Sequence, residues 1–103
     1  MAKFIATLSV IPIGTKSTSL SKYVAKVIEK LKKAGINLEV TPMNTVIYSD
    51  NLEDILKAVE IAHDALREEG VERMDLFLKI DARHDKPGRK PIDKVKAVLE
   101  KLT

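Results

Sequence analysis

The sequence contains no cysteine and no tryptophan, and only four of its residues are tyrosine or phenylalanine. A chain without cysteine has no disulfide bond, no thiolate metal ligand and no cysteine nucleophile. No stretch reaches the roughly 18 consecutive apolar residues that cross a bilayer. The first ten residues hold a single lysine and lack a small-residue cleavage site, which is not typical of a signal peptide. We therefore expect a cytoplasmic protein with no membrane partner.

The size and composition predict one domain spanning residues 1–103. The chain has room for a single core, and 45% hydrophobic with 32% charged residues is typical of a globular protein. Residues 79–101 hold eight basic and four acidic residues, so this segment carries +4 whereas the whole chain carries +3. Basic domains often bind nucleic acid, but sheets that bind RNA stack bases on aromatic rings, which are scarce here. The pattern indicates a solvated surface, and no nucleic-acid partner is expected.

The first half of the chain predicts a strand followed by an amphipathic helix. Residues 3–11 are rich in β-branched and apolar side chains and stop at Pro12. Residues 19–34 place apolar side chains at helical spacing and end before Gly35. The hydroxyl residues at positions 17–19 are candidates to cap this helix.

The second half predicts a hairpin, a helix, a strand and a final short helix. Residues 37–41 and 45–48 are strand-like runs on either side of a Pro-Met-Asn turn. Residues 52–69 have helical spacing and are followed by glycine. Residues 74–80 alternate like a strand, and residues 92–102 place apolar side chains on one side of a helix.

This order predicts an α+β, ferredoxin-like βαββαβ sandwich: a four-stranded antiparallel sheet with two helices on one face, plus a short C-terminal helix. Alternation places Leu38 and Val40 on the covered face. Val46 and Tyr48 lie on the open face if the hairpin loop has two residues, and one bulge would reverse this. An apolar open face predicts a partner subunit or a ligand. The residues assigned to it are Ile5, Thr7, Ser9, Ile11, Asn37, Glu39, Thr41, Phe77, Lys79 and Asp81.

Residues 11–24, IPIGTKSTSLSKYV, place one glycine and a cluster of hydroxyl residues before a helix. They lack the glycines of a dinucleotide site and of a phosphate loop. A serine nucleophile would need a histidine base, but His63 is expected to be a partly buried structural residue and His84 a solvated one. Two distant histidines also make a poor zinc site. We predict no catalytic residue and no metal site. Candidate anion contacts are Ser17, Thr18, Ser19 and Lys79.

Three segments, SVIPIGTKSTSLSKYV, EVTPMNTVIYS and KIDARHDKPGRK, resemble the small thiamine-binding protein family in their order and separation. The most specific parts are Ile-Pro-Ile-Gly at 11–14 with Ser-Thr-Ser at 17–19, and Thr-Pro-Met at 41–43 followed by Thr45. The sequence departs from the family at Asn44, where glycine is common. The resemblance implies a ferredoxin-like fold, homodimers that can pair into tetramers, and binding of thiamine or its pyrimidine portion near a subunit interface. It implies no catalysis and no required cofactor.

The open face and the hairpin carry groups that suit such a ligand. An aminopyrimidine presents ring nitrogens and an exocyclic amine, which need hydroxyl or carboxylate partners beside apolar surface. The candidate polar contacts are Ser9, Glu39, Thr41 and Thr45. The candidate apolar contacts are Ile11, Pro12, Met43 and Val46. Tyr48 or Asp81 would favour the cationic thiazolium ring.

Two other functions stay open on the sequence. One is a homo-oligomeric regulatory or interaction module that binds no thiamine-related ligand. The other is an acylphosphatase-like enzyme on the same fold, which needs an arginine beside its anion loop and an asparagine that orients water. Asn44 could be that asparagine, but no arginine precedes Arg67. The sequence favours the binding protein over both alternatives.

Overall fold

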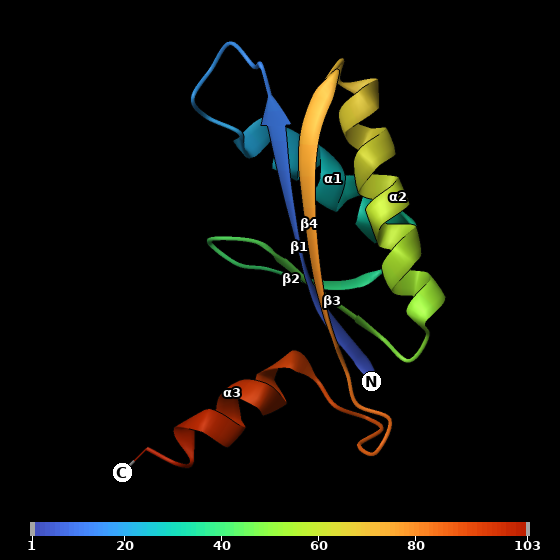
Figure 1. Ribbon diagram of the computed structural model, residues 1–103, viewed down its shortest axis with the longest axis vertical. Coiled ribbons are helices and arrows are strands. Elements are labelled where there is room, and N and C mark those ends of the chain that lie inside the picture. The colour runs from blue at the N-terminus through green and yellow to red at the C-terminus, as the bar shows by residue number, and fades with distance from the viewer. Residues whose placement is uncertain (1, 103) are drawn as a thin grey trace.

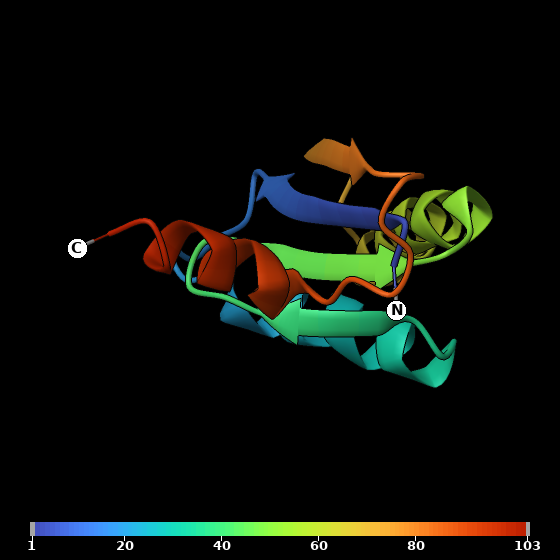
Figure 2. The ribbon, with the colours of Figure 1, turned by 90° about the horizontal axis from the view of Figure 1, so that it is seen from below.

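The computed structural model describes residues 2–102 and forms one antiparallel sheet with helices packed on one of its faces. The strand order is β2-β3-β1-β4. Helices α1 and α2 cover the same side of the sheet (Figures 1 and 2). The predicted ferredoxin-like α+β fold is confirmed. Its elements are β1 (Phe4–Ile13), α1 (Ser21–Lys33), β2 (Asn37–Val40), β3 (Thr45–Ser49), α2 (Leu52–Glu68), β4 (Arg73–Ala82) and α3 (Pro91–Leu99).

The core lies between the sheet and the two helices, and alternation along β1 supplies its centre. Phe4, Ala6 and Leu8 are at most 8% exposed and belong to the core cluster. Leu31 of α1 and Leu66 of α2 are fully buried in the same cluster. Burying one such leucine contributes about 2 kcal/mol to folding. The apolar side chains that recur every second residue along the strand and about every 3.6 residues along the helices therefore form this core.

The start of α1 differs from the prediction. The helix begins at Ser21, its N-cap position is Leu20, and no side chain caps it. The Ser17 Oγ accepts a hydrogen bond from the Ser19 N–H at 3.0 Å, within the loop before the helix. The Ser19 Oγ lies 3.2 Å from the Ser21 Oγ. The predicted cap is wrong because these hydroxyls bond to each other and to the loop.

His63 is exposed, whereas the spacing predicted partial burial. It follows Ala62, which is fully buried, and one residue turns the side chain about 100° around the helix. The side chain is 50% exposed, and its Nδ1 lies 2.9 Å from Asp64 Oδ1. The apolar stripe of α2 is narrower than the prediction assumed. Its buried residues are Ile55, Ala58, Ala62, Ala65 and Leu66.

The β2–β3 hairpin has the register of a two-residue loop. Glu39 pairs with Val46 in register, and the Thr41 N–H donates to the Asn44 carbonyl at 3.0 Å. This register places Val46 on the open face of the sheet, as the two-residue alternative predicted. Val40 pairs in register with the buried Thr45, so it lies on the covered face as predicted. Its side chain is nevertheless 60% exposed, because β2 ends at this residue.

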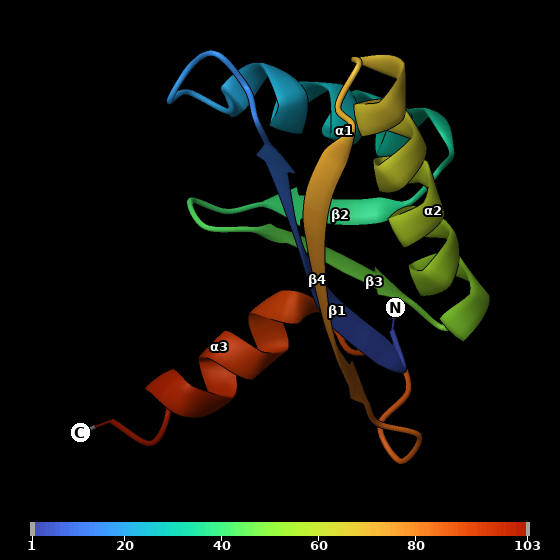
Figure 3. The same ribbon diagram turned by 45° about the horizontal axis from the view of Figure 1, so that its top comes forward.

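β1 is longer than the strand beside it, and this mismatch leaves a free edge. The pairing of β1 with β3 ends at Leu8 and Thr45, whereas its pairing with β4 continues to Ile13 and Arg73. From Ser9 onward, β1 therefore has a strand on one side only. Figure 3 shows the tip of the hairpin turning away from the end of β1, with α1 above the hairpin in this view.

The open face of the sheet is partly covered. Ile5 is only 7% exposed, whereas Ile11 is 40% and Phe77 is 58% exposed. Ile5 pairs in register with Asp81, and the Arg89 side chain reaches Asp81 from the loop before α3. The loop thus shields one end of the face and leaves the other end exposed.

α3 lies on the opposite side of the β2–β3 hairpin from α1 (Figures 1 and 3). None of its residues is buried. Apolar side chains at its helical spacing are exposed by 45–67%, and we call them the α3 stripe. In the part of the chain that the structure describes, no helix is long and apolar enough to cross a membrane. The α3 stripe consists of Ile92, Val95, Val98, Leu99 and Leu102.

Candidate functional site

A pocket of about 440 Å³ occupies the space beside the free edge of β1, and we call it the notch pocket. Its walls come from the end of β1, the start of α1, the hairpin turn and one residue of β4. Its volume is within the range of small-molecule sites, and its lining is mostly apolar. The lining residues are Leu8, Ser9, Val10, Ile11, Leu20, Val24, Val27, Val40, Thr41, Pro42, Met43, Asn44, Thr45 and Phe77.

Five of the eight candidate ligand contacts line this pocket, and they come from two segments far apart in sequence. Ser9 and Ile11 belong to β1, whereas Thr41, Met43 and Thr45 belong to the hairpin. They meet because β1 and β3 are neighbours in the sheet and the hairpin turns away at the end of their pairing. The pocket therefore exists only in the folded arrangement of both segments. Whether these residues bind a ligand stays a prediction.

Two hydroxyls are available in the notch pocket and a third is not. No side-chain hydrogen bond among residues 2–102 uses the hydroxyl of Ser9 or Thr45. The Thr41 Oγ1 lies 2.8 Å from both oxygens of Asn44 and accepts from the Asn44 N–H at 3.1 Å. Thr41 therefore holds the turn in shape. Ser9 and Thr45 project from opposite faces of the sheet, so the pocket wraps around the strand edge.

The other three candidate contacts lie outside the notch pocket. Glu39 and Val46 are a cross-strand pair on the open face, one position beyond the pocket rim. Pro12 is buried and pairs in register with Met74 of β4. The notch pocket therefore does not bring these three candidates together with the other five.

Several lining residues were not predicted as ligand contacts. Val24 and Val27 of α1 belong to the apolar spacing that predicted this helix and had no ligand role. Phe77 was assigned to the apolar open face but not to the ligand contacts, although it pairs in register with Ser9. The pairing of Phe77 with Ser9 could have been derived once the strand order was assumed, and it would have added an aromatic ring to the site.

The candidate anion contacts are not brought together. Ser17 and Ser19 line a shallow loop pocket of about 460 Å³ with Lys16 and Lys22. Thr18 and Lys79 are not among the residues that line it. Lys79 lies in the middle of β4, paired with Thr7 of β1. The four residues therefore do not form one anion site.

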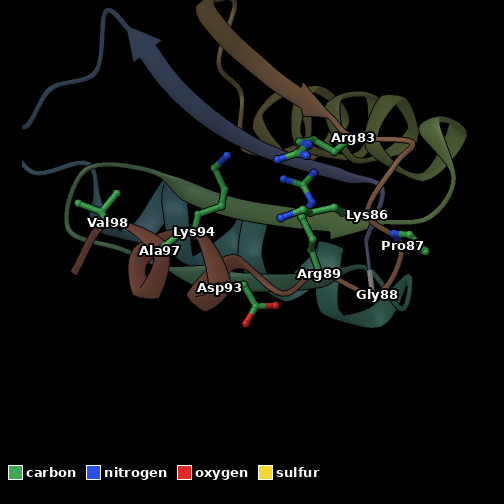
Figure 4. A pocket seen from close by; sticks show the side chains of 9 residues that line it. All are labelled: Arg83, Lys86, Pro87, Gly88, Arg89, Asp93, Lys94, Ala97 and Val98. Atoms are coloured by element: carbon green, nitrogen blue, oxygen red, sulfur yellow. The ribbon is translucent and has the colours of Figure 1, made fainter. Parts of the chain in front are cut away.

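A second cavity, of about 590 Å³, lies between the end of β4 and α3 (Figure 4). Its lining is basic, but most of its charges are already paired. Arg83 binds Asp85 with its Nε and Nη2, at 3.0 and 2.6 Å. Arg89 binds Asp81 at 2.7 Å. Lys86 has no carboxylate partner among residues 2–102. These ion pairs join the end of β4 to the loop before α3, and we call this region the ion-paired junction.

Asp81 is the centre of that junction. Its Oδ2 accepts hydrogen bonds from Arg89 at 2.7 Å and from Lys94 at 2.9 Å. The Arg89 hydrogen bond, followed by the Lys94 hydrogen bond, lowers the pKa of Asp81 to about 2. Arg83 likewise lowers the pKa of Asp85 to about 2 through its hydrogen bond. Both carboxyl groups are therefore ionised at neutral pH. Among residues 2–102, no group of three His, Asp or Glu side chains could hold a metal ion.

Comparison with known proteins identifies the family. The sequence profile described as thiamine-binding protein matches residues 6–99. The chain belongs to the thiamine-binding protein family. It is 44% identical over 97 residues to a UPF0045 protein of Methanothermobacter thermautotrophicus, a match that covers 94% of this chain and 97% of that protein.

Solved structures of relatives share the architecture of this thiamine-binding family member. The Methanocaldococcus jannaschii UPF0045 protein is 41% identical, with a TM-score of 0.78 over 94% of this chain and 96% of that one. A Thermotoga maritima protein, provisionally named a thiamine biosynthesis/salvage protein, is 27% identical, with a TM-score of 0.72 over 92% and 97% of the two chains. The profile match runs from β1 to the end of α3 and so includes every segment that lines the notch pocket.

Proposed function

We propose that the protein binds thiamine, or the hydroxymethylpyrimidine portion of thiamine, in the notch pocket without altering it chemically. The observation that carries this proposal is the convergence of five candidate contacts from β1 and the hairpin on one pocket. Membership of the thiamine-binding protein family supports the ligand. The mostly apolar walls suit the flat faces of a pyrimidine ring.

The chemistry of the pocket supports binding without reaction. Among the described residues that line the notch pocket, none carries an ionisable side chain. General acid–base catalysis needs such a group within hydrogen-bond reach of the substrate. The neutral pyrimidine then belongs inside the pocket, where the Ser9 and Thr45 hydroxyls face it. The thiazolium cation belongs at the mouth, beside the exposed ring of Phe77, whose face attracts cations.

The proposed assembly is a homodimer, in which a second copy covers the exposed apolar surface. Phe77 and Ile11 on the open face are 58% and 40% exposed, and the α3 stripe is unburied. Exposed apolar surface of this kind is typical of protein interfaces. Pairing of two dimers through the remaining surface would give the tetramer that the sequence resemblance implies.

Calorimetric titration of the protein with thiamine, hydroxymethylpyrimidine and thiamine phosphates tests the ligand. We expect saturable binding of the first two compounds. Ser9→Ala and Thr45→Val each remove one unpaired hydroxyl and should weaken binding by about threefold to tenfold. Thr7→Val is the matched control, because Thr7 lies on β1 outside the pocket.

The possible outcomes distinguish a wrong binding site from a wrong ligand. Binding that neither pocket variant changes would place the ligand elsewhere on the protein. No binding of any of the three compounds, in a protein that still assembles, would instead favour the interaction module without a thiamine-related ligand.

A further inference from the structure

The hydrogen bonds of β1 alternate between its two neighbours, and one contact fixes which residues bond to which strand. The Arg83 N–H donates to the Lys3 carbonyl at 2.8 Å. The pairing of β1 with β4 then continues without interruption from Phe4 to Ile13. In an antiparallel pair, every second residue directs both its N–H and its C=O to a given neighbour. The odd-numbered residues of β1 therefore bond to β4, and the even-numbered residues face the β3 side.

The sequence supports the same alternation independently. Pro12 lies within β1 and pairs in register with Met74, yet proline has no N–H to donate. Proline is tolerated in a strand where its nitrogen faces away from the neighbouring strand. Position 12 is even-numbered, so its nitrogen faces the side that β3 does not reach.

Val10 is the first residue of β1 whose backbone groups lose their partner strand. The even-numbered residues 4, 6 and 8 pair with β3, and this pairing stops at Leu8 and Thr45. Continuing the register would place Met43 opposite Val10, but Met43 lies in the hairpin turn and is 86% exposed. Among residues 2–102, no backbone hydrogen bond outside the helices and strands involves Val10.

The unpaired groups of Val10 face the notch pocket. Val10 lines that pocket and is half-buried, with its side chain packed against the core cluster. Backbone N–H and C=O groups that have no partner strand beside a mostly apolar pocket favour a ligand that can bond to both. In an extended residue these two groups lie side by side on one edge of the strand.

We propose that the backbone N–H and C=O of Val10 bind the ligand at the position where a residue of β3 would otherwise pair with them. The Val10 N–H donates to a ring nitrogen and the Val10 C=O accepts from the adjacent exocyclic amine, so the site selects planar heterocycles with an N=C–NH₂ edge. The 4-aminopyrimidine of thiamine has that edge, and this inference rests on the proposed function. The unpaired hydroxyls of Ser9 and Thr45 would then contact the remainder of the ring.

Amide hydrogen exchange measured by ¹H–¹⁵N NMR tests the contact in the unmodified protein, with hydroxymethylpyrimidine as the probe. Without ligand, we expect the Val10 amide to exchange much faster than the Ser9 amide, which bonds to β4. Saturating ligand should slow exchange at Val10 by about tenfold or more and leave Ser9 unchanged. A Val10 amide as protected as Ser9 before ligand is added would overturn the proposal.

Ligand and protein variants provide the second measurement. An analogue with methyl in place of the amine should bind about tenfold more weakly. Val10→Pro and Val10→Ala both lose the valine side chain, but only Val10→Pro also loses the N–H that faces away from β4. Val10→Pro should therefore bind the ligand more weakly than Val10→Ala, and Thr7→Val, on β1 outside the pocket, is the control. Ligand binding that leaves the Val10 amide unprotected contradicts the backbone contact only. A protein that binds neither thiamine nor hydroxymethylpyrimidine contradicts the proposed function itself.

Discussion

The Arg89 side chain joins the loop before α3 to Asp81 of β4 and to the start of β1. Its Nη1 donates to the Asp81 carboxylate at 2.7 Å, and its Nη2 donates to the Lys3 carbonyl at 3.0 Å. Arg89 is only 8% exposed, so both contacts are shielded from water on the guanidinium side. Lys94 adds a second cation to Asp81 from the first turns of α3. The C-terminal helix is therefore anchored by charge at its beginning, whereas its apolar stripe is unburied.

Acid should weaken this anchor. The pKa of Asp81 is about 2 in the folded protein and near 4 in an unfolded chain. The ionised carboxylate therefore contributes stability that is present above about pH 4 and is lost as the pH falls toward 2. Because Asp81 is 38% exposed, solvent screening limits the contribution to about 1 kcal/mol.

Urea unfolding of wild type and Asp81→Asn at several pH values measures that contribution. The variant should be less stable than wild type at pH 7, and the difference should shrink as the pH approaches 2. Asp75→Asn is the matched control, because Asp75 lies on β4 and forms no ion pair among residues 2–102. A constant difference across the pH range would contradict the assignment to Asp81.

The hairpin turn should depend on the Thr41 hydroxyl. That hydroxyl accepts from the Asn44 N–H at 3.1 Å and lies 2.8 Å from the Asn44 carbonyl. Thr41→Val keeps the shape and removes these bonds, so it should lower the free energy of unfolding by about 1 kcal/mol. Thr41→Ser keeps the hydroxyl and should retain most of the stability. Equal losses in both variants would show that the methyl group, and not the hydroxyl, holds the turn.

The elements of the fold follow from local patterns in the sequence. Alternation predicted which side of β1 forms the core, and the helical spacing predicted both helices that cover it. Gly35 and Gly70 marked the ends of α1 and α2, and both have positive φ, at 77° and 82°. These features depend on a few neighbouring residues, and the sequence therefore contains them directly.

The candidate site depends on distances between segments, which local patterns do not encode. The free edge at Val10 arises because β1 continues beyond Leu8, where its pairing with β3 ends. Alternation identifies the face of a strand but not where its partner ends. The wrong cap of α1 and the wrong burial of His63 have related causes. The cap of α1 was wrong because the hydroxyl groups before the helix bond within the loop. The burial of His63 was wrong because the width of the buried stripe of α2 depends on the elements that pack against it.

The α3 stripe should govern assembly. Val95 lies at the centre of the stripe and is 49% exposed, so a lysine there costs an isolated chain little. If a second copy covers the stripe, the same lysine places an unpaired charge in an apolar interface, where desolvation is costly. We therefore expect Val95→Lys to shift the protein toward monomer in sedimentation measured over a range of concentrations. Ala97→Lys adds the same charge on the opposite side of α3 and should leave assembly unchanged. Wild-type dimers that tolerate Val95→Lys would place the interface elsewhere, with the exposed Phe77 region of the open face as the surface to change next.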